Sequence, residues 1–142
     1  MNAGLRLLSS APLVGLCRLV TGLVLLVAAL SKIGEPSVFA RQIAHYDVIP
    51  IGLENVIAIT LPWIELVTGL ALVLGVRARS GAWLATGLMV AFTLAVAQAV
   101  ARRLDIECGC FGTTDATRVG TSKLLENLAL TIASLIASLR AR

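Results

Sequence analysis

Two cysteines separated by one glycine are the residues of this chain best suited to chemistry. They form the segment Cys108-Gly109-Cys110, which Phe111 and Gly112 follow. A disulfide across a single glycine closes a very small ring, so it is strained, and strained, exposed disulfides tend to be catalytic or labile. We therefore predict that Cys108 and Cys110 are a catalytic redox pair.

Other interpretations of the cysteines stay open. The bridge could be purely structural, or the two thiols could be inert. A zinc site made from Cys108, Cys110, His45 and one acid has suitable ligand types. The chain has three cysteines and one histidine in all, so no second pair supports a metal and we expect none. Cys17 lies in an apolar stretch and is expected to be a small buried hydrophobe.

Ionisable side chains inside apolar stretches are the second candidate group. Such groups are costly in a bilayer and indicate function by default. Arg18 and Glu65 are the deepest, and we expect them to form an ion pair that fixes helix packing. A sharper hypothesis makes Glu65 a proton carrier for redox chemistry. A second polar set is expected to line a shallow pocket beneath the cysteine loop: Lys32, Gln98, Arg102, Lys123, Glu126 and Asn127.

The composition shows which kind of fold must position these residues. Of 142 residues, 58% are hydrophobic and 14% are charged, with a formal net charge of +4 and a mean hydropathy of +0.92. Soluble domains carry about 25% charged residues. The composition therefore excludes a soluble enzyme, a disordered chain and a nucleic-acid-binding domain, and it indicates one integral membrane domain over residues 1–142.

Apolar stretches predict an all-α membrane protein, a four-transmembrane-helix up-down bundle. A helix needs about 20 apolar residues to cross the hydrocarbon core. Four stretches qualify, at residues 12–31, 56–75, 81–101 and 122–139. A basic head before residues 19–30 also resembles a signal peptide, but Arg18 interrupts that apolar region.

The loop between the first two spans is predicted to hold a short interfacial helix. Pro36 suits the first position of a helix, and Phe39, Ile43 and Tyr46 repeat at helical spacing. One apolar face is typical of a helix that lies on a membrane surface.

Charge density sets the expected orientation. With four spans, the head, the turn at 76–80 and the tail share one side, which carries five arginines and no acid: Arg6, Arg77, Arg79, Arg140 and Arg142. The positive-inside rule then places both termini in the cytoplasm and the cysteine loop outside, in an oxidising compartment.

Several motifs resemble one family. In order they are Gly22, Ser31-Lys32, Phe39-Ala40, Leu61-Pro62-Trp63-x-Glu65 with Gly69, Cys108-Gly109-Cys110-Phe111-Gly112, and Asn127-Leu128. The chain resembles the DoxX-like membrane proteins, and within them the MauE (methylamine utilisation) branch, from about Gly15 to Leu139. It departs at Glu126, where family members often carry Arg, and it is short for MauE.

The resemblance implies a redox-associated protein of the bacterial inner membrane. MauE-like proteins assist disulfide formation or maturation of an exported, disulfide-rich amine dehydrogenase subunit. The expected activity is therefore that of a membrane thiol–disulfide oxidoreductase or its accessory. Its partners would be an exported thiol protein or a thioredoxin-like protein, with a quinone as electron acceptor by analogy with quinone-linked disulfide-generating membrane proteins.

Two other functions compete with this hypothesis. One is a non-enzymatic assembly subunit whose loop disulfide only braces a binding surface. The other is a small transporter that uses Arg18 and Glu65, for which the sequence offers no interrupted helix pair or inverted repeat.

Overall fold

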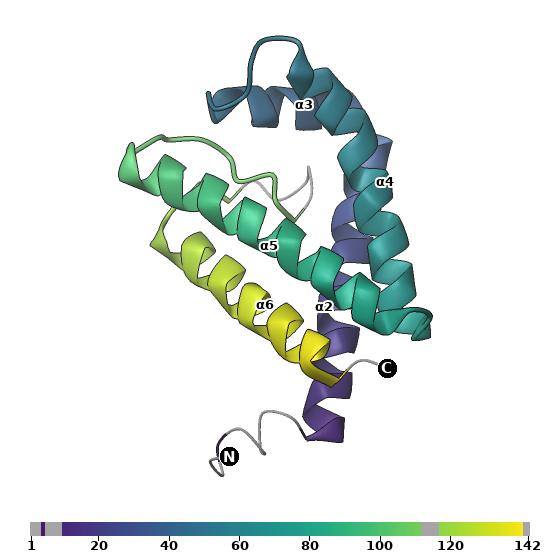
Figure 1. The fold of residues 1–142 in the computed structure, drawn as a ribbon. Helices are drawn as coiled ribbons and strands as arrows, with labels where there is room; N and C mark the ends of the chain where they lie inside the picture. Colours follow the sequence, from purple (N-terminus) through teal and green to yellow (C-terminus); the bar gives the residue numbers. More distant parts are fainter. Residues whose placement is uncertain (1–3, 5–9, 112–116, 141–142) are drawn as a thin grey trace.

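Helices form the regular structure of the described residues, together with one isolated β-bridge between Glu107 and Arg118 (Figure 1). The computed structural model describes residues 4, 10–111 and 117–140. In this part of the chain the helices are α2 (Ala11–Gly34), α3 (Pro36–His45), α4 (Leu53–Leu74), α5 (Ala78–Ala101) and α6 (Thr121–Arg140). Arg6, Gly112 and Arg142, used above for orientation or motif, lie outside the described residues.

Four of these helices are long and apolar enough to cross a membrane. They are α2, α4, α5 and α6, and each begins within three residues of the corresponding predicted span. The α4–α5 turn is shorter than expected, because Gly75 (φ 74°) caps the end of α4 at Leu74 and α5 already begins at Ala78. The predicted four-helix membrane bundle is confirmed.

The short helix after the first span is also confirmed. Helix α3 begins at Pro36 and ends at His45, and its buried residues include Phe39, Ile43 and Gln42. The apolar face that the sequence assigned to a membrane surface therefore packs against the protein, chiefly against α4.

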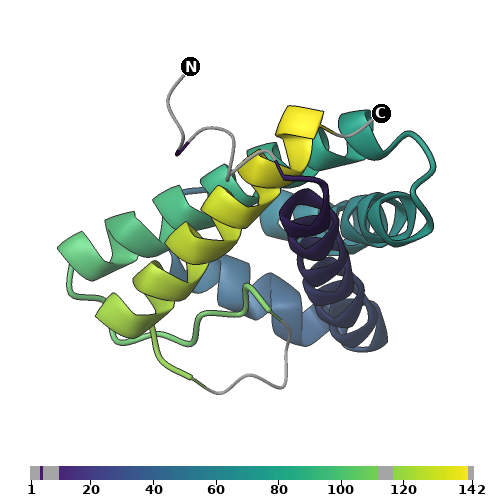
Figure 2. The ribbon, with the colours of Figure 1, turned by 90° about the horizontal axis from the view of Figure 1, so that it is seen from below.

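The spans form two antiparallel pairs that cross (Figures 1 and 2). Helix α2 packs along α4, and α5 packs along α6. The start of α2, the α4–α5 turn and the end of α6 lie at one end of the bundle, which we call the turn end. Helix α3 and the segments 102–111 and 117–120 lie at the opposite end, the loop end.

Small residues let α2 and α4 approach closely. A Cβ atom on Gly22 would lie 2.9 Å from Val73 Cγ2 and 3.1 Å from the Gly69 carbonyl oxygen. One on Gly69 would lie 2.9 Å from the Gly22 oxygen. Only glycine fits at either position, as is common where membrane helices touch. The core beside this contact is formed by Leu25, Leu72, Ala82, Ala85, Met89 and Ala137.

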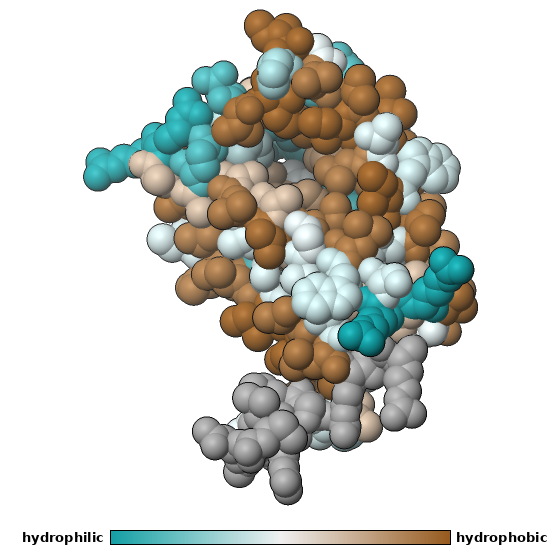
Figure 3. All heavy atoms as spheres, viewed as in Figure 1, coloured by the Kyte–Doolittle hydropathy of each residue, from teal (hydrophilic) through white to brown (hydrophobic). Residues whose placement is uncertain are grey.

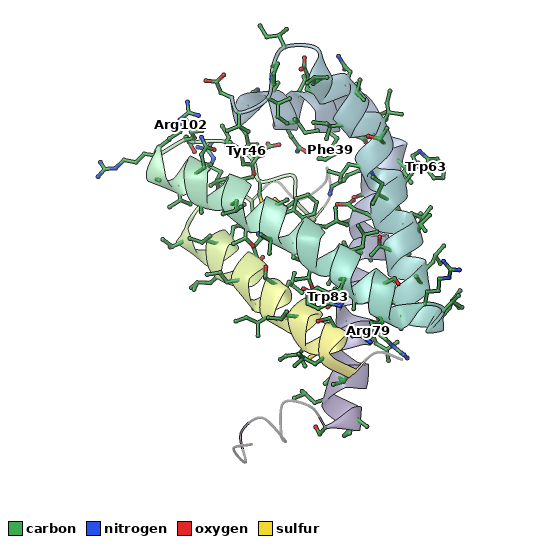
Figure 4. The ribbon with its side chains drawn as sticks, viewed as in Figure 1. Phe39, Tyr46, Trp63, Arg79, Trp83 and Arg102 are labelled. Carbon is green, nitrogen blue, oxygen red and sulfur yellow. The ribbon has the colours of Figure 1, made fainter. Side chains whose placement is uncertain are left out.

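The flanks of the bundle are apolar and exposed, as a lipid-facing surface must be. Val27, Val67 and Leu94 are 64%, 64% and 65% exposed. Figure 3 shows this apolar surface over the middle of the molecule, with hydrophilic groups gathered at the upper left and lower right. The exposed Trp63 and Trp83 lie on the outer sides of α4 and α5 (Figure 4).

Candidate functional site

The cysteine segment is held by a short antiparallel pairing at the loop end. The Val119 amide donates to the Ile106 carbonyl at 2.8 Å, and the Cys108 amide donates to the Thr117 carbonyl at 3.1 Å. Gly109 then turns the chain with φ 63°, a left-handed conformation that glycine adopts without strain. The Cys110 thiol consequently points back to the Cys108 carbonyl, with Sγ 3.6 Å from that oxygen.

Both cysteines are free thiols, and both are buried. Cys108 is 2% exposed and Cys110 is 6% exposed. They pack against Val96 and Phe92 of α5 in an apolar cluster. The expectation of an exposed, accessible loop is therefore wrong for these two side chains, because the segment folds inward against α5 and lies under α3.

Helix α3 covers the cysteine segment through specific polar contacts. The Tyr46 hydroxyl donates to the Cys108 carbonyl at 2.6 Å and lies 3.9 Å from Cys110 Sγ. Gln42 Nε2 donates to Glu107 Oε2 at 3.3 Å. Arg102 ties the end of α5 to the same region by donating to the Tyr46 carbonyl at 3.3 Å. Figure 4 shows Tyr46 and Phe39 pointing from α3 into the space above α5.

A fully buried ion pair lies beneath the cysteines. Lys32 Nζ is 2.7 Å from Glu65 Oε1, and both side chains are 0% exposed. The same ammonium donates to the Cys110 carbonyl at 2.7 Å. The predicted Arg18–Glu65 pair is therefore wrong. Lys32, near the end of α2, reaches Glu65 across the bundle, whereas the Arg18 guanidinium lies beside Gly75 at the turn end.

The predicted shallow pocket of six polar residues does not form. Lys32 belongs to the buried pair, and Arg102 instead pairs with Asp47 at the surface. Gln98 lies half-buried on α5, and Asn127 is buried on α6, where its Nδ2 donates to the Lys123 carbonyl at 2.9 Å. Glu126 is exposed and bonds Lys123 Nζ at 3.0 Å. The set is divided: three of its members lie within about one turn of α6 and contact one another (Lys123, Glu126 and Asn127), whereas Lys32 and Arg102 pair with Glu65 and Asp47.

The pKa values of the two thiols are shifted in opposite directions. The hydrogen bond from the Cys110 thiol, with help from the Tyr46 hydroxyl and the charge of Lys123, lowers the pKa of Cys108 to about 6 in spite of burial. The same hydrogen bond and burial raise the pKa of Cys110. Burial and the neighbouring sulfurs also raise the pKa of Tyr46, which keeps its proton for donation. These surroundings therefore favour the thiolate at Cys108 and the thiol at Cys110.

The metal interpretation gains no ligand set within the described ranges. No group of three or more His, Cys, Asp or Glu side chains there is arranged to hold an ion. His45 is exposed and lines a surface hollow with Asp105, Glu107 and Arg118, not the cysteine cluster.

Sequence reasoning missed Tyr46 and Gln42 as site residues. Tyr46 was counted only as part of an apolar face, yet a phenol at the end of an amphipathic helix carries a hydroxyl that needs a partner when buried. Gln42 is buried, although it is polar and lies outside the Phe39–Ile43–Tyr46 spacing. A polar residue at the centre of a short apolar helix was the available signal.

The fold and site define a class, namely a multi-pass membrane protein with four spans and a buried thiol pair at one end. A family model described as methylamine utilisation protein MauE matches residues 10–140. The chain therefore belongs to the MauE family.

Three relatives bear the name methylamine utilization protein MauE. The protein of Methylophilus methylotrophus is 35% identical over 79% of this chain and 60% of its own length. The protein of Methylorubrum extorquens is 38% identical over 63% of this chain and 48% of its own length. The protein of Paracoccus denitrificans is 33% identical over 83% of this chain and 64% of its own length. The chain thus spans about half to two thirds of the length of these relatives. No solved structure matches it significantly.

Proposed function

We propose that this protein supports thiol–disulfide exchange at the membrane, through Cys108 and Cys110, in the maturation of an exported protein. The observation that carries the proposal is a thiolate held beside a thiol: the pKa of Cys108 is lowered to about 6 and that of Cys110 is raised. A pair with this split is poised for exchange, since the thiolate is the nucleophile and the better leaving group.

The exchange follows from this asymmetry. In the oxidised protein, a partner thiolate attacks the Cys108 sulfur, and Cys110 leaves and takes up a proton, which its raised pKa favours. A second partner thiolate then attacks the mixed disulfide, and Cys108 leaves as the thiolate that its surroundings favour. The partner gains one disulfide, two electrons pass to the protein, and Cys108 and Cys110 are left reduced.

Burial sets a condition on this chemistry. Since Cys108 and Cys110 are 2% and 6% exposed, a protein partner reaches them only when the cover formed by α3 moves. Three polar contacts join the cover to the cysteine segment and to the end of α5, namely Tyr46 to Cys108, Gln42 to Glu107, and Arg102 to Tyr46, while its apolar face packs against α4. A partner that docks at the loop end would form new contacts in place of these, and the free energy of docking would move α3 away from the cysteines.

The setting of the proposal follows from the family. The relatives are named for methylamine utilisation, and we extend that pathway, with a disulfide-rich exported amine dehydrogenase subunit as partner, to this chain. A thioredoxin-like protein is the other partner class. The same proposal includes three further points: the chain is DoxX-like, it lies in the bacterial inner membrane, and its loop end faces outward.

Trapping of a mixed disulfide tests the function. In Cys110→Ser the resolving thiol is gone, so Cys108 should stay linked to its partner as a species that dithiothreitol releases. Cys17→Ser is the matched control, because Cys17 lies in α2 and packs with the central core. It should trap nothing and should leave maturation unchanged. Normal disulfide content in the exported partner of a Cys108→Ser/Cys110→Ser strain would overturn the proposal.

A further inference from the structure

A small apolar cavity adjoins the two cysteines. Its volume is about 120 Å³, and Cys108, Gly109 and Cys110 form one wall. The other walls come from α3, α4 and α5, including Phe39, Leu61 and Phe92. Pockets for drug-sized ligands measure about 300–1,000 Å³. This cavity has room for one ring, and a larger molecule would have to extend through its mouth.

The mouth faces the side of the bundle. Helices α4 and α5 are close at their shared turn and diverge toward the loop end (Figure 1). The cavity lies in the angle between them, with Ile57 and Leu61 on one side and Phe92 and Ala95 on the other. Figure 3 shows the hollow where α3, α4 and α5 meet, within apolar surface. A ligand that enters between two membrane-spanning helices arrives from the lipid.

The cavity is apolar but is not chemically inert. The Lys32 ammonium has three protons, and it donates to Glu65 Oε1 and to the Cys110 carbonyl. Its other close neighbours are the rings of Phe39 and Phe92, with centroids 4.8 Å and 5.0 Å from Nζ. Lys32 and both rings line the cavity, as does Tyr46. The Tyr46 hydroxyl already donates its proton to the Cys108 carbonyl, so a flat ring with carbonyl oxygens finds here aromatic walls and the third ammonium proton of Lys32 as a hydrogen-bond donor.

The cavity therefore combines access from the lipid, room for one ring, a hydrogen-bond donor and a thiol pair in its wall. We propose that the cavity binds the ring of a membrane quinone, which reoxidises Cys108 and Cys110. The inference rests on the proposed function and names the electron acceptor of that site. In the step, an S–S bond forms between Cys108 and Cys110, and two electrons pass to the quinone. One proton comes from the Cys110 thiol and one from solvent, so a hydroquinone leaves.

A photoreactive azidoquinone tests binding without any redox turnover. The Cys108→Ser/Cys110→Ser variant in nanodiscs should be labelled on the peptides that contain residues 57–61 and 92–95, and excess decylubiquinone should suppress the label at least tenfold. Leu61→Trp fills the cavity and should abolish this labelling. Val67→Trp is the matched control, since Val67 lies on the same helix but is 64% exposed to lipid. It should label like its parent.

Turnover is measured separately on the protein with its native cysteines. Decylubiquinone should oxidise Cys108 and Cys110, read as loss of alkylation by mass spectrometry. The rate should fall at least tenfold in Leu61→Trp and stay within twofold in Val67→Trp, with melting temperatures recorded for both.

The outcomes separate the two proposals. Labelling spread evenly over lipid-facing residues, or undiminished in a folded Leu61→Trp, overturns the quinone site even if the Cys110→Ser trap captures a partner. Specific labelling of the cavity without any trapped partner would support the quinone site and would overturn the proposed thiol exchange with a protein.

Discussion

Lys32 Nζ lies 2.7 Å from Glu65 Oε1, and the same ammonium donates to the carbonyl of Cys110. One buried charge pair thus joins α2, α4 and the cysteine segment. Removing two charges from water is expensive, and the attraction between them repays that cost only with good geometry and further hydrogen bonds. The Cys110 carbonyl supplies one such bond, so the position of the cysteine segment depends on the ion pair.

The first prediction concerns this ion pair. Lys32→Met or Glu65→Leu alone leaves one buried charge without its partner and should cost about 3–5 kcal/mol in unfolding free energy. The double variant removes both charges and should cost much less than the sum. Thermal unfolding in detergent measures all three.

Asp47→Asn is the control for a charge pair at the surface. The Arg102–Asp47 pair is 44% and 83% exposed, so its loss should cost only about 0–1 kcal/mol. Additive losses in the Lys32→Met/Glu65→Leu variant would show that the two charges act independently.

The second prediction concerns the pH dependence of Cys108. Because its pKa is lowered to about 6, the rate of alkylation of Cys108 by iodoacetamide should rise with pH and reach half its maximum near pH 6. A free cysteine would reach that point near pH ~8.5. Burial slows the absolute rate but leaves the midpoint in place. Mass spectrometry of the Cys108 peptide gives the profile.

Two variants identify the causes of that pKa. Cys110→Ala removes the principal hydrogen-bond donor, and Tyr46→Phe removes a weaker one, so both should raise the midpoint, the first by more. Cys17→Ser should leave it unchanged. An unshifted midpoint in Cys110→Ala would contradict the assignment of Cys108 as the thiolate.

The helices were predictable because their signals are local. A run of about 20 apolar residues can satisfy its backbone in lipid only as a helix, so the four spans followed from composition alone. Pro36 and the Phe39–Ile43–Tyr46 spacing placed α3 in the same way. The family motifs matched along nearly the whole chain.

The partners of the buried charges were not predictable from depth alone. Arg18 and Glu65 seemed matched because both lie inside spans, but depth does not say which face of a helix a residue occupies. Lys32 lies near the end of α2 and appeared to belong to the outer polar set. Its pairing with Glu65 depends on how α2 and α4 cross at Gly22 and Gly69, which is a tertiary property.

The third prediction concerns Gly109. An added Cβ would lie 2.5 Å from Gln42 Oε1, and φ is 63°, so Gly109→Ala should both clash and strain the backbone. The left-handed conformation alone costs about 1–2 kcal/mol. We expect a lower melting temperature and an altered midpoint for Cys108 alkylation.

Gln42→Ala combined with Gly109→Ala separates the two causes. It removes the clash but not the strain, so stability should be recovered in part. Gly87→Ala is the control, because nothing lies within 4 Å of its added Cβ. Equal stability of Gly109→Ala and Gly87→Ala would show that Gln42 does not press on the cysteine turn.

The fourth prediction concerns the crossing of α2 and α4. Gly22→Val and Gly69→Val should push the helices apart, since even a Cβ at either site lies within 3.1 Å of the other glycine's carbonyl oxygen. Gly15→Val, on α2 with open space around it, should be tolerated. Lys32 and Glu65 lie on these helices. In Gly22→Val and Gly69→Val the midpoint of Cys108 alkylation should therefore also move away from pH 6. Unchanged pH profiles of Cys108 alkylation in both variants would mean that the crossing of α2 and α4 does not determine the geometry of the cysteine site.

The last prediction concerns orientation. Arg77 and Arg79 lie at the turn end, beside the start of α5, and both are exposed. Cations close to span ends are retained in the cytoplasm, so the turn end should face inward and the loop end outward.

Native cysteines are poor reporters because Cys108 and Cys110 are buried, so single cysteines are placed in a chain lacking all three. Ile51→Cys at the loop end, where Ile51 is 101% exposed, should react with a membrane-impermeant maleimide in intact cells. Arg79→Cys should react only after lysis. The reverse pattern would put the thiol pair in the reducing cytoplasm and remove the basis for oxidising an exported partner.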